Sequence, residues 1–126
     1  MKNIIISLSI FIITIITILL SLNYLNKVCT ELNKNASSLE DLVNNEDWDS
    51  AKKQSISFLS TWERYSNQIA VFVHHEEIDN INTEVEELSQ YIKSENKDEA
   101  LADISVIKFY IIHINKFEKI NIQNIF

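Results

Sequence analysis

Residues 78 to 92 read IDNINTEVEELSQYI, and their apolar side chains recur at alternating steps of three and four. These side chains are Ile78, Ile81, Val85, Leu88 and Ile92. The steps average about 3.5 residues, the period at which antiparallel helices pack knobs-into-holes at crossing angles of about 20°. The segment is therefore predicted to be one helix of a bundle.

Three further segments have the same spacing. The first comprises Leu25, Cys29, Leu32, Ala36, Leu39 and Val43; the second Trp48, Ala51, Ser55, Phe58, Trp62, Tyr65, Ile69 and Phe72; the third Ala100, Ile104, Ile107, Ile111 and Ile114. Glycine and proline, the usual residues of tight turns, are absent from the sequence, which favours helices over β-hairpins. We predict an all-α fold, an antiparallel four-helix bundle built from two helical hairpins.

The polar breaks between the apolar stripes contain signals for helix starts. Asn45 precedes EDW, and Asn96 is followed three residues later by Glu99, a pattern typical of an N-cap with a capping-box acid. The break at 73 to 77, VHHEE, is weaker because none of its residues ends a helix. It is predicted to be either a short turn or a kink inside one long helix.

A shift of 49 residues superposes apolar positions in the two halves of the chain. The pairs are Leu32 and Ile81, Leu39 and Leu88, Leu42 and Tyr91, Val43 and Ile92, Ala51 and Ala100, Phe58 and Ile107, and Trp62 and Ile111. The pattern is compatible with a duplicated hairpin, although helices in phase would produce some of these matches without duplication.

Residues 4 to 22, IIISLSIFIITIITILLSL, contain no charged residue. At about 1.5 Å per residue, this run nearly matches the hydrocarbon thickness of a bilayer. Residues 19 to 24, LLSLNY, at the end of this run lack the small-residue cleavage site of a secretory signal. We predict an uncleaved transmembrane anchor over 1–23 and a helical domain over 24–126.

The short tail before the anchor indicates how the chain is oriented. Lys2 and the α-amino group lie on one side of the apolar run, and Lys27 and Lys34 lie on the other. Because so short a tail usually stays inside, we expect a single-pass cell-membrane protein with its C-terminal domain outside the cytoplasm. Ser7, Thr14 and Ser21 recur every seven residues; their hydroxyls either face another membrane helix or bond to their own helix.

The formal net charge of −7 excludes some partners. An acidic domain is repelled by nucleic acid and by anionic lipid headgroups, so we expect no nucleic-acid partner. Cys29 is the single cysteine and cannot form an internal disulfide. We expect it to serve as a small apolar side chain.

Several short motifs occur in a characteristic order: DW-x-x-A at 47 to 51, FVHHEEID at 72 to 79, D-E-A-L at 98 to 101, and HI-x-x-x-E from 113 followed by a terminal NIF. Together with the anchor, they resemble the domain of unknown function 4363 family, short anchored helical proteins of low-GC Gram-positive bacteria. The resemblance implies the anchor and the helical fold but no activity. It also implies a membrane partner, because such proteins look like accessories to small multi-pass membrane proteins.

The cluster at 74 to 79 is the densest group of metal-ligating side chains. His75 and Asp79 are four residues apart and share a helix face, and His113 could be a third ligand from another helix. Tyr110 stands where a Glu-x-x-His motif of a di-metal bundle would have its acid. The alternative is that the cluster forms the cap and solvated first turn of a helix, with His113 beside the apolar stripe.

The remaining candidate sites are apolar. Trp48, Phe58, Trp62, Tyr65 and Phe72 could line a ligand pocket, although their spacing indicates a core. The apolar residues of the terminal INIQNIF, which are Ile120, Ile122, Ile125 and Phe126, are expected to dock on the bundle or in a partner's groove.

No arrangement of nucleophile and base, and no glycine loop for phosphate, is recognisable in the sequence, so we expect neither an enzyme nor a cofactor. The function that we predict is a non-catalytic accessory or interaction protein of the bacterial cell surface, partnered by a membrane protein, with a homo-oligomer left open. The alternative is an extracytoplasmic metal- or small-ligand-binding bundle centred on His75, Asp79 and His113.

Overall fold

The structure is a computed structural model that describes residues 1–125, apart from the side chains of residues 117, 118, 120–123 and 125. The docking predicted for the terminal apolar residues Ile120, Ile122, Ile125 and Phe126 concerns side chains outside this description. The described chain forms helices α1 (Lys2–Asn44), α2 (Trp48–Ile69), α3 (His75–Lys93) and α4 (Lys97–Ile125). The all-α fold is confirmed.

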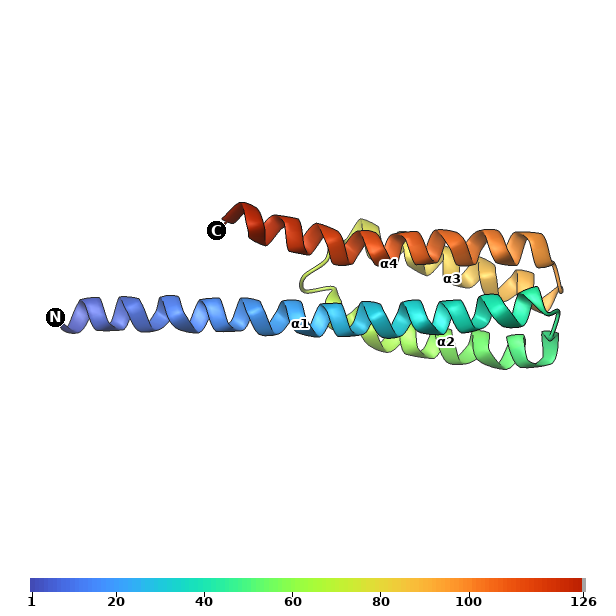
Figure 1. Cartoon of the computed structure of the whole chain (residues 1–126), viewed down its shortest axis with the longest axis horizontal. Helices are drawn as coiled ribbons and strands as arrows, with labels where there is room; N and C mark the ends of the chain where they lie inside the picture. Colours follow the sequence, from blue (N-terminus) through green and yellow to red (C-terminus); the bar gives the residue numbers. More distant parts are fainter. Residues whose placement is uncertain (126) are drawn as a thin grey trace.

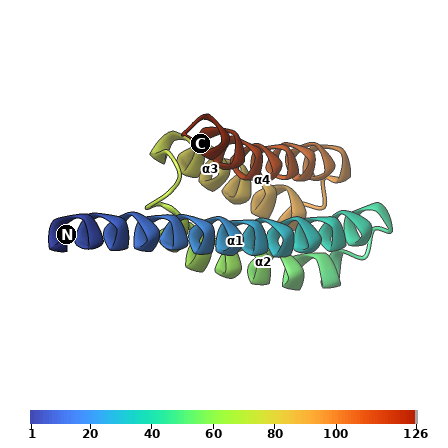
Figure 2. The same ribbon diagram turned by 60° about the vertical axis from the view of Figure 1, so that its left-hand side comes forward.

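The four helices run antiparallel in sequence order and form a closed bundle (Figure 1). Each helix packs against the next, and α4 returns to pack against α1. The turns at 45–47 and 94–96 lie together at what we call the distal end. The turn at 70–74 and the C-terminal end of α4 lie at the opposite, proximal end, and the N-terminal part of α1 extends beyond both (Figure 1 and Figure 2).

The apolar stripes form the core as predicted. All five stripe residues of α3 and all five of α4 are buried, as are the six predicted in α1. In α2, Trp48 and Tyr65 are partly buried. Phe72 was wrongly included, because it follows the end of α2 in a turn and keeps 39% of its surface exposed. Helical periodicity no longer sets the direction of a side chain once the helix has ended.

Both distal turns use the same hydrogen-bonding motif. At the end of α1, the amide of Glu46 donates to the carbonyl of Val43 and the amide of Asp47 donates to that of Leu42, each at 3.0 Å. Glu46 has φ 56°, a left-handed conformation that usually requires glycine. This pattern is the Schellman motif. A glycine-free chain therefore ends α1 with a glutamate in a strained position.

The second distal turn repeats the first after the 49-residue shift. Glu95 has φ 58°, its amide donates to Ile92, and the amide of Asn96 donates to Tyr91. The four residues that form each motif are related by the same shift as the apolar stripes. This shared turn geometry supports two similar hairpins as the halves of the bundle.

The helix starts agree with one prediction and correct the other. The amide of Glu99 donates to Oδ1 of Asn96 at 3.4 Å, so Asn96 caps α4 as expected. Asn45 does not cap α2; it is the C-cap residue of α1, directly after the last helical residue Asn44. Asp47 is the cap, since its Oδ1 accepts a hydrogen bond from the Ser50 amide at 3.3 Å. Glu46, the one residue between them, takes the left-handed position of the Schellman turn.

Residues 70–74 form a turn, and α3 begins at His75. The structure thus resolves the choice at 73 to 77 in favour of a turn. Val73 is buried and fixes the turn to the core, whereas Val71 is 81% exposed. The turn therefore presents apolar side chains at the proximal end.

The apolar run and the first bundle helix are parts of one helix, so the predicted boundary between residues 23 and 24 falls inside α1. The apolar window of α1 has a mean hydropathy of 2.8, and none of it is buried in the bundle. By length and composition, α1 can cross a membrane; an N-terminal signal sequence meets the same criterion. The hydroxyls of Thr14 and Ser21 donate to the carbonyls of Ile10 and Thr17, the second of the two predicted uses.

Candidate functional site

The three residues predicted to bind metal lie at the proximal half of α3 and α4. His75 and Asp79 are exposed, and His113 is half-buried. Nδ1 of His113 lies 3.4 Å from Oε1 of Glu77, and its ring stacks on that of Phe109 at 5.9 Å. Among the described residues, one group of side chains brings three ligand atoms close enough to hold a single ion. That group does not include His75, Asp79 or His113. The site at His75, Asp79 and His113 remains a prediction.

The polar cluster at the start of α3 also has the local role considered as the alternative. His74 is the N-cap residue by its extended backbone, φ −60° and ψ 138°. Glu76 and Glu77 occupy the first turn, where the helix dipole favours negative charge.

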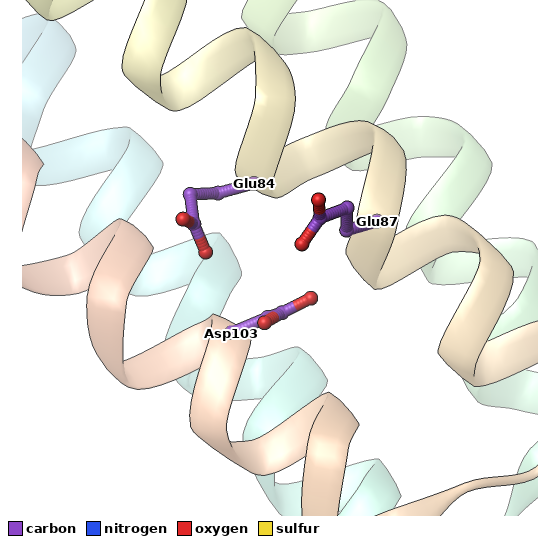
Figure 3. A group of neighbouring side chains, drawn as sticks. All are labelled: Glu84, Glu87 and Asp103. Carbon is purple, nitrogen blue, oxygen red and sulfur yellow. The ribbon is translucent and has the colours of Figure 1, made fainter.

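A different group of acids converges between α3 and α4. Glu84 and Glu87 are one turn apart on α3, and Asp103 lies opposite them on α4 (Figure 3). One carboxylate oxygen from each residue lies within 4.8 Å of the other two. The sequence does not indicate this group, because Asp103 is 16 residues or more from the two glutamates along the chain. The available signal was an aspartate three residues after Ala100, next to Ile104 on the inward face of α4.

Asp103 is the buried member of this acidic group. Its exposed fraction is 8%, and its Oδ2 atom is inaccessible to solvent and has no hydrogen-bond partner. Glu84 is half-buried and Glu87 is exposed, so the group opens toward solvent on one side. The ion pairs of the described residues include none of the three acids.

The electrostatics of the acidic group follow from this geometry. Burial, followed by the negative charges of Glu84, Glu87 and Glu99, raises the pKa of Asp103 from 3.8 to about 6. Burial and the charge of Glu87 raise the pKa of Glu84 as well. The ionised group therefore concentrates negative charge, and it is stabilised by anything that brings in positive charge.

The aromatic residues considered for a ligand pocket are divided between core and surface. Phe58 and Trp62 are buried in the core, and Phe72 is exposed. Trp62 donates from Nε1 to Oδ1 of Asn82 at 2.7 Å and lines an open groove of about 290 Å³ between α2 and α3. The groove is bordered by Glu63 and Glu86 and is more polar than a typical ligand pocket.

Cys29 lies in the core, as expected for a small apolar side chain. Burial raises the pKa of its thiol to about 11, an effect that Lys119 partly opposes. A thiol with so high a pKa stays protonated at neutral pH and is a poor nucleophile.

Four antiparallel helices, one of which extends beyond the bundle as an exposed apolar helix, define the class of this protein: an all-α bundle with a candidate membrane span. The family model described as Domain of unknown function (DUF4363) matches residues 19–125. The chain belongs to this family. No curated protein and no solved structure matches it.

Proposed function

We propose that this protein is a membrane-anchored accessory subunit of the bacterial cell surface, which acts by contact with a membrane-protein partner and not by catalysis. The observation that carries the proposal is the continuity of α1 from Lys2 to Asn44. Its first half is apolar and exposed, and its second half is a core helix of the bundle.

A continuous helix couples the two halves mechanically. Burial begins at Leu25, three residues after the apolar run ends at Leu22. No turn separates the two parts, so a rotation or tilt of the apolar segment is transmitted to the bundle. A flexible tether would not transmit it. An accessory subunit that responds to its partner needs such a rigid connection.

The proximal end is suited to face a bilayer. Val71 is 81% exposed and Phe72 is 39% exposed. Both lie in the turn between α2 and α3, at the end of the bundle from which α1 projects. Apolar side chains at this level would enter the interfacial region when α1 spans the membrane. The distal turns, with the charged side chains of Glu46 and Glu95, would stand away from the headgroups.

The outer face of α4 offers a surface for the partner. Phe109 is 63% exposed and Ile112 is 46% exposed, and the two are three residues apart on one helix face. Large exposed apolar side chains on an otherwise polar helix are typical of contact surfaces. Ile56, at 69% exposed, lies on α2, which is diagonally opposite α4 in the bundle.

The topology can be tested by labelling single cysteines. In a Cys29→Ala background, Asp98→Cys at the distal end should react with a membrane-impermeant maleimide in intact cells. Lys2→Cys should react only after lysis. The reverse labelling pattern, or a mature protein without its first residues, would overturn the proposed anchor and orientation.

The partner can be tested by photo-crosslinking in native membranes. A photoreactive amino acid in place of Phe109 should form an adduct with one multi-pass membrane protein. The same amino acid in place of Ile56 is the matched control and should form none. Adducts of equal yield at both positions, or an adduct only with a second copy of this chain, would contradict the proposal.

A further inference from the structure

We propose that Glu84, Glu87 and Asp103 form a binding site for a divalent cation of the Ca²⁺ class, which joins α3 to α4. The three carboxylates come from two helices and point toward one another (Figure 3). This site is separate from the predicted histidine site and from the surfaces that we propose to contact the membrane or a partner.

The ligand atoms indicate the class of ion. One carboxylate oxygen from each residue lies within 4.8 Å of the other two, so all three can reach one divalent cation. Ca²⁺ accepts irregular sets of carboxylate oxygens, whereas Mg²⁺ demands near-ideal octahedral geometry and keeps most of its water, so three converging carboxylates favour Ca²⁺. A ligand set made only of carboxylate oxygens also favours Ca²⁺ over Zn²⁺.

The second observation is the state of Asp103. Its Oδ2 is buried without a hydrogen-bond donor, although buried polar atoms in proteins are nearly always partnered. Figure 3 shows this carboxylate turned toward Glu84 and Glu87. A cation bound among them supplies the positive partner that the buried oxygen lacks.

The openness of the site predicts its affinity. Glu87 is exposed, so an ion can enter from solvent and keep water molecules as its remaining ligands. Three carboxylates without a dedicated loop correspond to the weaker Ca²⁺ sites, with dissociation constants of about 10⁻⁴ to 10⁻³ M. Occupancy then depends on millimolar Ca²⁺, as in an extracellular medium.

Thermal unfolding of the full-length protein in detergent provides the test. Relative to protein in EGTA, Ca²⁺ at ten times its dissociation constant should raise the Tm by about 5 to 10 °C. Asp103→Asn and Glu84→Gln should each abolish this rise. Glu86→Gln, a substitution of an exposed neighbour on α3, is the matched control and should retain it.

Terbium luminescence gives a second measurement that does not depend on unfolding. The charge of Glu99, then burial, and then the charges of Glu87, Asp103 and Glu84 raise the pKa of Tyr91. Tyr91 therefore lies near the three acids and should sensitise Tb³⁺ bound among them. Added Ca²⁺ should displace Tb³⁺ and remove the sensitised emission. The emission should also be lost in Asp103→Asn and in Tyr91→Phe. Of these two variants, only Tyr91→Phe should keep the Ca²⁺-dependent rise in Tm.

Two results would overturn the cation site. One is a Tm that is indifferent to Ca²⁺, which would show that no bound ion joins α3 to α4 through these carboxylates. The other is a Ca²⁺ response that persists in Asp103→Asn and Glu84→Gln, which would place the ion elsewhere.

Discussion

At the scale of single residues, the most informative side chain is Asp103. It is a charged residue on the inward face of α4, and the surrounding charges that raise its pKa are all negative. A carboxyl group whose folded-state pKa is raised binds its proton more tightly in the folded protein than in the unfolded chain. Between the two pKa values, stability therefore falls as pH rises.

The metal-free protein should show this pH dependence. In EGTA, wild-type stability should rise as the pH falls from about 7 toward 4, because the folded-state pKa is about 6 and the ordinary value is 3.8. Asp103→Asn should be more stable than wild type at pH 7.5 by on the order of 1 kcal/mol, and the gain should vanish near pH 4. Denaturant melts at several pH values measure both effects. A loss of stability in the variant at pH 7.5 would contradict the prediction.

At the scale of the elements, the distal turns show how helices end without glycine. Glu46 and Glu95 take the left-handed conformation at the C′ position of a Schellman motif. Each also pairs with a lysine, Glu46 with Lys97 at 3.3 Å and Glu95 with Lys52 at 2.8 Å. These pairs are exposed and contribute little, so they do not offset the backbone strain in full.

Glycine at either turn should therefore stabilise the bundle. Glu46→Gly is expected to raise the free energy of unfolding by about 0.5–1 kcal/mol, because glycine takes a positive φ without a steric penalty. Glu46→Ala removes the same ion pair but keeps a Cβ atom, so it should give no gain. Denaturant midpoints of the two variants measure the difference. Equal midpoints would contradict the prediction, because they would show that a Cβ atom at position 46 carries no steric penalty.

At the scale of the whole molecule, the proposed function depends on α1 as one rigid rod. At about 1.5 Å per residue, its 43 residues span roughly 65 Å, from the exposed apolar end to the distal turns. The bundle occupies the second half of this length. The join near residues 22 to 25 is where the two halves can be uncoupled.

Proline at the join should separate folding from coupling. Asn23→Pro removes a helical hydrogen bond and kinks α1, at a local cost of about 3 kcal/mol. Because burial begins only at Leu25, the Tm of the bundle should fall by no more than a few degrees, whereas the crosslink from position 109 should be lost. Asn23→Ala, which keeps the helix, should preserve both. A crosslink of undiminished yield in Asn23→Pro would show that rigid coupling is not required.

The sequence by itself determined the helices, the apolar stripes and the exposed apolar run, because each depends on the local period of the α-helix. The cap at Asn96 was also predictable, since a cap acts on its own first turn. The turn at 70–74 was not, because no residue there breaks a helix; its position depends on tertiary contacts such as the burial of Val73 in the core. The convergence of Glu84 and Glu87 with Asp103 was decided by the tertiary structure alone. Residues 16 or more positions apart meet only when two helices adopt a particular register, and that register depends on the packing of the whole core.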